Sequence, residues 1–388
     1  MKNPPLSVEY ITTVKLEINR EITILHRTHR NRPDIKKLKK MEYNHELKVE
    51  EDGYMKSFAL QEHEEYKAFF ETYGFVVIDN ILSPNECAIS CQEIWSFLQH
   101  HDDNIDQENP STWSETHWPK NICRNGGFMG KFPYWKRMAN LNETFVSKQP
   151  QAWKNRENRD VYSVFAKLLC PKLWTSIDRY GVMRPKTTSE LEEKEDWSTK
   201  SEWLHWDLSP FHYGTSAAGF APKKKIDRKG LEENYGGLRV QGLITLTDCP
   251  VENGGFHCVP GFQHQFFQWR EENINGYGAL PGIQRRNFIE VPENDELRQH
   301  ICQVPMRKGA LLIWNSMLPH GNFPNQSKDE FRMVQYIKMI PVDDSREFEP
   351  AISSCSFNND EWFPENYEIS SLGKRLYGIE DWDTFEVE

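Results

Sequence analysis

The chain has 388 residues, a formal net charge of -11 at pH 7 and an aromatic content of 13%. The acidic balance argues against a nucleic-acid partner, which requires a basic face, and no apolar run reaches the roughly 18 residues of a membrane span. The length fits one large core with additions at its ends.

Residues 1–55 form a polar and basic extension. They contain Glu17, Glu21 and Asp34 and little serine, so a solvated segment is favoured over a transit peptide. The eight cysteines of the chain are scattered and form no Cys-x-x-Cys pair. This predicts free thiols in a reducing compartment, and therefore a cytoplasmic protein.

Helices and one strand are predicted directly after this extension. Residues 60–73 have helical periodicity and lead into a short apolar strand at 74–79. Ser83 can cap a second helix, with Pro84 in its first turn and Glu86 completing a capping box. The core is therefore expected to have an N-terminal helical region.

Two further elements and two loops precede the β-rich half of the chain. Residues 161–169 are predicted to be helical, and 174–183 to be a strand with a turn at Tyr180-Gly181. Gly126–Gly130 lacks the Gly-Lys-Ser/Thr ending of a phosphate loop and is interpreted as a turn at the mouth of a pocket. The hydrophilic segment 214–237 is either a lid or a solvated insertion.

From residue 238 onward the pattern indicates short β-strands. They are predicted at 239–246, 256–259, 302–306, 310–314 and 333–340. Glu252–Gly255 is interpreted as a tight turn that joins antiparallel strands. Without strand–helix alternation, the pattern predicts a mainly β domain with added helices over residues 56–340, built as a double-stranded β-helix, the cupin-like jelly roll. Residues 341–388 form an acidic, aromatic tail that we expect to pack on this core.

The chemistry centres on His205 and Asp207. Side chains two residues apart share one face of an extended segment, so the two can hold adjacent positions on a metal. The best third ligand is His320, and two histidines with one carboxylate form the facial triad of non-haem Fe(II) oxygenases. Arg332 lies twelve residues after His320, among apolar residues that predict a buried position. Its guanidinium can there pair with the distal carboxylate of 2-oxoglutarate.

Other residues near this pattern have competing interpretations. Three histidines are rival ligands that we expect to be structural: His212, His257 and His264. Arg179 and Arg184 either meet an anionic substrate or form structural salt bridges, the second being favoured. Trp203 and Trp206 flank the ligands and are expected to pack rather than to take part in chemistry.

From about Tyr73 to Pro341 the sequence resembles the phytanoyl-CoA dioxygenase family of Fe(II)/2-oxoglutarate oxygenases. The matching motifs are Gly74-Phe75-Val76-Val77, Leu82-Ser83-Pro84-Asn85-Glu86, His205-Trp206-Asp207, Glu252-Asn253-Gly254-Gly255-Phe256, Val259-Pro260-Gly261 and Leu318-Pro319-His320-Gly321, followed by Arg332. One departure is Pro260-Gly261-Phe262-Gln263-His264, which is a residue longer than the Pro-Gly-Ser-His of the family.

The resemblance implies that His205, Asp207 and His320 bind iron and that Arg332 binds the C5 carboxylate of 2-oxoglutarate. Asn322 stands where the family often has a small polar side chain bonded to the co-substrate. Gln241 faces the cavity by strand parity and is expected to assist.

The expected function is that of an Fe(II)- and 2-oxoglutarate-dependent dioxygenase that hydroxylates a small molecule and releases succinate and CO2, with ascorbate as a possible assay requirement. The carboxylate of Asp207 favours hydroxylation over halogenation. Two alternatives stay open: a jelly-roll protein that binds a ligand without catalysis, and a cupin-type metal enzyme that does not use 2-oxoglutarate. The sequence predicts neither the substrate nor the oligomeric state.

Overall fold

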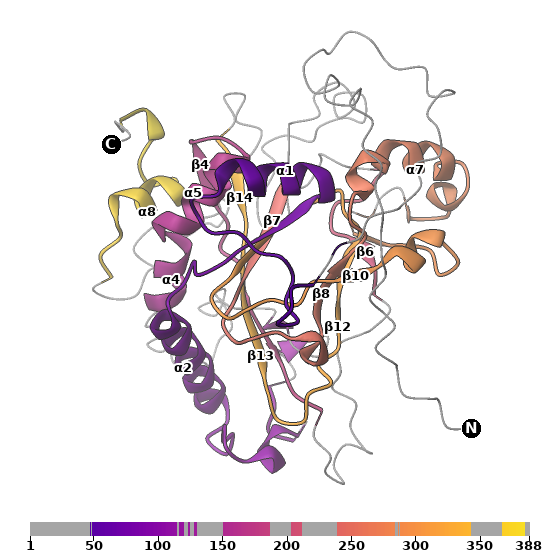
Figure 1. Cartoon of the computed structure of the whole chain (residues 1–388). Coiled ribbons are helices and arrows are strands. Elements are labelled where there is room, and N and C mark those ends of the chain that lie inside the picture. Colours follow the sequence, from indigo (N-terminus) through magenta and orange to yellow (C-terminus); the bar gives the residue numbers. More distant parts are fainter. Residues whose placement is uncertain are drawn as a thin grey trace, which may run out of the picture.

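The computed structural model describes residues 47, 49–114, 116–119, 123–124, 128–129, 150–186, 203–211, 239–283, 286, 288–342 and 367–384 (Figure 1). Outside them lie nearly all of the predicted basic extension, the three glycines of Gly126–Gly130, His212, the 214–237 segment and much of the acidic tail. The predictions for these segments remain predictions, as does the division of the chain at residues 55 and 340.

The larger of two main sheets has seven strands, and its neighbouring strands are antiparallel. In spatial order the strands are β1 (Phe75–Ile78), β11 (Leu311–Asn315), β7 (Val240–Thr245), β13 (Arg332–Ile337), β5 (Tyr180–Met183), β3 (Phe128–Met129) and β2 (Cys123–Arg124). Strands that follow one another in the sequence are rarely adjacent in the sheet, because the chain passes back and forth between this sheet and a second one.

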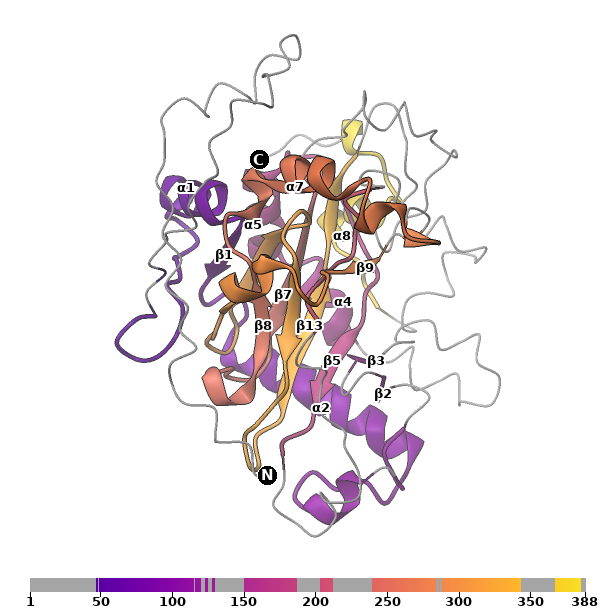
Figure 2. The same cartoon turned by 90° about the vertical axis from the view of Figure 1, so that its right-hand side faces the viewer.

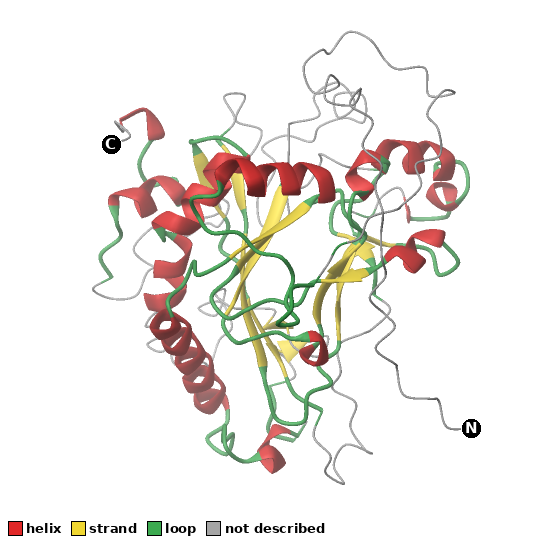
Figure 3. Ribbon diagram, viewed as in Figure 1, coloured by secondary structure: helices red, strands yellow, loops and turns green. Residues whose placement is uncertain are grey.

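The second sheet has five antiparallel strands and carries most of the candidate site. Its order is β10 (Cys302–Gln303), β8 (Gly255–Cys258), β12 (His320–Phe323), β6 (His205–Trp206) and β9 (Ile289–Glu290). A separate pair joins β14 (Met339–Pro341) to β4 (Leu173–Thr175). Two facing antiparallel sheets with strands that alternate between them make the predicted double-stranded β-helix (Figure 3).

Both faces of the large sheet are covered, so the strands alternate between two apolar environments. Leu243, Trp314 and Val334 face the small sheet, where the ring of Phe256 lies 4.7 Å from that of Trp314. A directly adjacent residue on each of these strands, Ile244, Ile313 and Met333, packs on the opposite face, against helices. Because side chains alternate between the two faces of a strand, every second residue of the large sheet points into the space between the sheets.

Most of the helices cover the outer face of the large sheet, on the left in Figure 1, whereas the helix at residues 266–273, on the right, packs on the side of the small sheet. The α-helices are α1 (His63–Tyr73), α2 (Pro84–His101), α4 (Pro150–Arg156), α5 (Arg159–Leu168), α7 (Phe266–Asn273) and α8 (Ser371–Leu376), and the 3-10 helices are η4 (Pro110–Trp113), η6 (Val251–Asn253), η7 (Phe262–His264), η8 (Tyr277–Ala279), η10 (Glu296–His300) and η12 (Trp382–Thr384). The predicted capping box is present, since Ser83 accepts from the Glu86 amide while the Glu86 side chain accepts from that of Ser83.

Several predicted β elements differ in the structure. Tyr180 and Gly181 form no turn but begin β5, because the preceding β4 belongs to another sheet and the break falls at 176–179. Glu252–Gly255 does not join hydrogen-bonded strands; it carries the chain from β7 in the large sheet to β8 in the small one. The predicted strand at 302–306 is limited to β10, and the one at 333–340 is divided at Lys338 into β13 and β14.

The described part of the acidic tail contacts α4, α5 and β4. Tyr377 donates its hydroxyl to the carbonyl of Trp153 at 3.1 Å. The Trp382 ring stacks on Tyr162 with 5.7 Å between centroids and donates to the carbonyl of Leu173 at 2.9 Å. The six cysteines with described side chains are free thiols, as predicted. In the described ranges, no helix has the length and apolar character needed to cross a membrane.

Candidate metal centre

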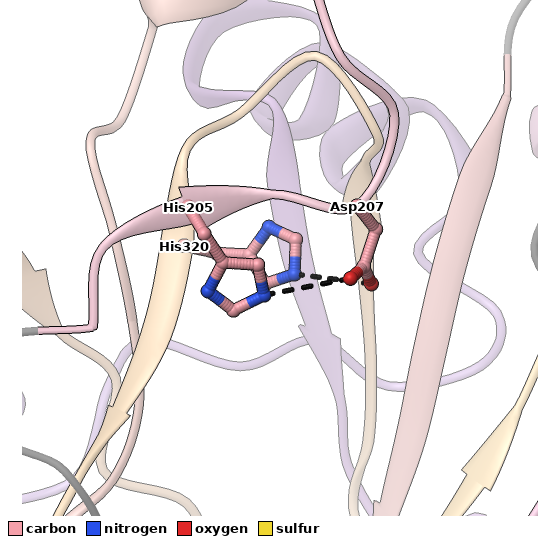
Figure 4. A group of neighbouring side chains, drawn as sticks. All are labelled: His205, Asp207 and His320. Atoms are coloured by element: carbon pink, nitrogen blue, oxygen red, sulfur yellow. Dashed lines mark ion pairs between the residues drawn. The ribbon is translucent and has the colours of Figure 1, made fainter. Parts of the chain in front are cut away.

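The structure brings His205, Asp207 and His320 together. His205 lies on β6 and Asp207 just beyond its end, while His320 begins β12 and stands directly opposite His205 in the antiparallel register. One ligand atom from each residue lies within 4.8 Å of the others. Both imidazole rings turn toward the carboxylate (Figure 4), with Nε2 of His205 3.5 Å from Oδ1 and Nε2 of His320 3.6 Å from Oδ2 of Asp207.

Backbone carbonyls fix the tautomer of both histidines. Nδ1 of His205 lies 3.0 Å from the carbonyl oxygen of Trp203, and Nδ1 of His320 lies 3.0 Å from that of Leu318. A carbonyl can only accept a hydrogen bond, so each Nδ1 carries a proton and Nε2 is the ring nitrogen left to bind a metal. This is the outer contact by which proteins orient metal-binding imidazoles, and here each carbonyl belongs to the residue two positions earlier.

The charges of the three groups suit a cation. Burial alone would raise the pKa of Asp207, but contacts with His205 and His320 and their charge hold that pKa well below its usual range. Burial lowers the pKa of His320, against the opposing influence of Asp207. A carboxylate beside two imidazoles whose Nε2 atoms face it is a ligand set of the two-histidine, one-carboxylate kind, with room left for other ligands. The three residues therefore fit Fe(II).

The small sheet can bring the two histidines this close only because of Gly321, which follows His320. A Cβ at this position would stand 2.4 Å from the carbonyl oxygen of Trp203 and 2.6 Å from Nε2 of His257. The contact that orients His205 therefore depends on the missing side chain at 321. Trp203 also stacks on the His205 ring, with centroids 4.3 Å apart.

Arg332 lies on the inner face of β13 and is fully buried. Its Nη2 donates to Oδ1 of Asn322 at 2.9 Å, and Asn322 shares a face of β12 with His320. Within the described residues Nη1 has no hydrogen-bond partner, and Cys249 lies alongside the guanidinium. The predicted pair of Arg332 and Asn322 therefore stands in contact between the sheets.

Gln241 and Trp314 add two more donors. They are directly opposite in the register of β7 with β11, and their shared face is the inner one. Gln241 Nε2 and Trp314 Nε1 are buried and, among described residues, lack a partner. Buried donors seldom stay unpaired, so with Nη1 of Arg332 they fit a ligand rich in acceptor oxygens, such as 2-oxoglutarate. Nothing in the sequence distinguished Trp314 from an ordinary core tryptophan.

The rival residues stand apart from this group. His257 is fully buried on the opposite face of β8, where burial lowers its pKa to about 3. His264 is exposed, with Nε2 3.0 Å from the Glu71 carbonyl. Arg184 donates to the Trp113 carbonyl at 2.6 Å and lies over the Trp118 ring, so it has structural contacts within the described residues.

The two flanking tryptophans differ from each other. Trp206 is fully buried, packs on Trp269 and donates to the carbonyl of Met317 at 2.9 Å, as expected of a packing residue. Trp203 packs as well, but its carbonyl also orients His205. That role is invisible in a sequence, because every residue has a carbonyl.

Comparison with known proteins bears on the family and the fold of the chain. The family model of phytanoyl-CoA dioxygenase matches residues 70–334. A curated Dictyostelium discoideum protein named "Putative phytanoyl-CoA dioxygenase" is 26% identical over 86% of this chain and 97% of its own length. Among solved structures, GlcNAc Inducible Gene 2 from Candida albicans has a TM-score of 0.52 at 14% identity, covering 86% of this chain and 81% of that one. A "Putative Oxidoreductase" from Salmonella typhimurium has a TM-score of 0.50 at 15% identity, covering 83% and 85%. These two structures share the fold.

Proposed function

The chain belongs to the phytanoyl-CoA dioxygenase family, and we propose that it is an Fe(II)- and 2-oxoglutarate-dependent oxygenase that hydroxylates a small-molecule substrate. The observation that carries the proposal is the group of His205, Asp207 and His320, whose Nε2 and carboxylate oxygen atoms converge while both Nδ1 atoms are committed to carbonyls. Such a set holds one face of a metal and leaves the other open.

Each residue of the site has a definite task in this proposal. The two imidazoles and Asp207 hold Fe(II). Arg332, aligned by its bond to Asn322, pairs with the C5 carboxylate of 2-oxoglutarate in a bidentate, directional contact. Gln241 and Trp314 donate to acceptor oxygens nearer the metal, since Trp314 lies 5.3 Å from the ring of His320. When bound, iron and 2-oxoglutarate supply the means to oxidise a C–H bond with O2, giving succinate and CO2 as by-products.

The protein also keeps the site largely dry. The rings of Trp203, Phe288 and Phe256 pack around the two histidines. Asp207 is the most exposed of the three, with 33% of its side-chain surface accessible, so substrate approaches from its side. An apolar wall around a polar, open coordination position strengthens electrostatic contacts with the co-substrate and limits side reactions with water.

The experiment that tests this proposal is a succinate assay of the purified full chain with Fe(II), ascorbate and 2-oxoglutarate, against fractionated small-molecule extracts. We expect slow succinate release alone and faster release with an active fraction, in which a new oxidised product appears. Asp207→Ala should abolish both rates, and His264→Ala, at an exposed position outside the group, should keep them. If iron binds at the three residues but no fraction stimulates succinate release, a metal enzyme that does not use 2-oxoglutarate becomes the better account.

A further inference from the structure

The guanidinium of Arg332 lies among uncharged groups. Arg332 is fully buried at the start of β13, and its Nη2 donates to Oδ1 of Asn322 on β12 at 2.9 Å. In the part of the chain that the structure describes, Nε and Nη1 have no hydrogen-bond partner. No described carboxylate therefore forms a hydrogen bond with this cation, although a buried charge ordinarily requires a counter-charge.

Gly255, the first residue of β8, gives the guanidinium its room. Figure 2, which views the molecule from the side of the small sheet, shows β8 in front of the large-sheet strands β7 and β13. A Cβ at Gly255 would stand 3.0 Å from Nε and 3.4 Å from Cζ of Arg332. The φ of 97° at this position lies in the region that favours glycine. On this side the guanidinium therefore lies against main chain, which carries no charge.

Cys249 borders the same space from the loop between β7 and η6. A Cβ at Gly255 would also stand 2.7 Å from Sγ of Cys249, so this sulfur and Nε of Arg332 enclose the place of the missing side chain. Backbone hydrogen bonds of 2.8 and 2.9 Å with Met306 fix Cys249, and its thiol donates to the Gly254 carbonyl at 3.5 Å. Burial raises the pKa of this thiol, against the opposing influence of Arg332. The third neighbour of the guanidinium is thus a neutral thiol.

The acids that flank Cys249 and Arg332 in the sequence lie at the surface. Asp248, Glu252 and Glu330 are all exposed. Solvent and salt screen charges in such positions, whereas a carboxylate beside the guanidinium would act at short range in a buried environment. The chain therefore holds this cation through contacts that do not cancel its charge.

We propose that Cys249 and Asn322 are positioning residues that hold Arg332 without neutralising it, and that they thereby keep its charge available for the distal carboxylate of the co-substrate. This inference rests on the function proposed above and adds the reason for neutral side chains at these two positions. A carboxylate at either position would give Arg332 an internal partner. The co-substrate would then have to displace that partner, so such a chain should fold well and bind 2-oxoglutarate poorly.

The test adds a carboxylate while keeping the shape of the side chain. Asn322→Asp is compared with wild type, and Cys249→Asp with Cys249→Asn, which has the same shape and no charge. Calorimetry of the anaerobic Fe(II)-loaded full chain measures 2-oxoglutarate binding. We expect each acidic variant to bind 2-oxoglutarate at least roughly tenfold more weakly than its neutral counterpart, as for a buried charge that loses its partner. Cys249→Ser should bind it as wild type does.

Urea unfolding of the metal-free full chain gives a second readout, which a role in packing alone would not move. Cys249→Asp should be more stable than Cys249→Asn, because the new carboxylate pairs with Arg332. When Arg332→Met is added to both variants, this order should reverse, because the carboxylate is then buried without a partner.

The control is Glu252→Gln, which removes a charge from an exposed position near Cys249 and should leave 2-oxoglutarate affinity unchanged. Unaltered affinity in Asn322→Asp would overturn the proposal, as would equal affinities in the two Cys249 variants or a stability order that Arg332→Met does not change. If wild type itself does not bind 2-oxoglutarate, the proposed function fails, and the unfolding comparison alone decides whether Arg332 is left without a counter-charge.

Discussion

His320 stands directly opposite His205 where β12 pairs with β6. In each ring Nδ1, the nitrogen that faces away from Asp207, lies against the backbone carbonyl of the residue two positions earlier in the chain. The pairing of two strands thus sets the separation of the two imidazoles, and their own backbone sets their tautomers. A site built on strands in this way is held in position before any metal arrives.

The first prediction concerns the choice of the third ligand. His320→Ala should weaken Fe(II) binding by more than the roughly 10- to 100-fold typical of losing an outer contact to a ligand, because a metal bond itself is lost. His257→Phe, on the other face of β8, should leave the iron affinity nearly unchanged. Anaerobic calorimetry with Fe(II) measures both variants, and equal losses would mean that the third ligand has been assigned wrongly.

Gly321 gives a second prediction that involves no ligand side chain. Gly321→Ala would push the carbonyl of Trp203 away from His205 and crowd His257, so it should cost about 1–3 kcal/mol of stability through overpacking and weaken metal binding as well. Gly276→Ala is the control, since its added Cβ would meet nothing closer than 3.9 Å. Thermal unfolding and metal titration should separate the two variants; identical behaviour would remove the role given to the close approach at Gly321.

Arg332 provides a third prediction. Removing one partner of a buried charge pair costs on the order of 2–5 kcal/mol, so Arg332→Ala should raise the dissociation constant of 2-oxoglutarate by roughly two orders of magnitude. Arg332→Lys should fall between wild type and alanine, because one ammonium cannot reproduce a bidentate contact. Iron affinity should hardly change. An unaltered 2-oxoglutarate affinity in the alanine variant would assign the C5 carboxylate to another cation, with Arg179 the first candidate.

His257 makes stability depend on pH. Its folded pKa of about 3 lies below the ordinary value of 6.5, so between these values the unfolded chain binds more protons than the folded one. Stability contributed by the neutral ring is complete above pH 6.5 and is lost as the pH falls. Between pH 6.5 and 5 this loss should approach about 2 kcal/mol. Urea unfolding of wild type and His257→Phe should show the difference, and parallel pH profiles would contradict it.

Local sequence patterns predicted most of the site residues, because spacing and alternation determine which side chains share a face of a strand. His205 and Asp207 were predicted from their spacing, and His320 and Arg332 from their order within a β-rich region, because the jelly roll repeatedly returns late strands beside early ones. Alternation also placed Gln241 on the inner face. The same patterns do not state which sheet a strand joins, so the Glu252–Gly255 connection was misinterpreted.

Other features of the site depend on contacts between distant segments. Tyr180-Gly181 reads as a turn in isolation, yet these residues pair with β13. The indole of Trp314, which lacks a hydrogen-bond partner among the described residues, lies beside the ring of His320 only because the small sheet stands across from it. Such relationships arise from tertiary packing and leave no local signature.

The most direct test of the central claim is an anaerobic titration of 2-oxoglutarate into the Fe(II)-loaded full chain, followed by the metal-to-ligand charge-transfer absorbance that chelation of the keto acid produces. The account predicts a saturable band in wild type and in His264→Ala, a band that saturates only at much higher 2-oxoglutarate in Arg332→Ala, and no band in His320→Ala. Stoichiometric Fe(II) binding that depends on His205, Asp207 and His320, with no such band at any 2-oxoglutarate concentration, would contradict it.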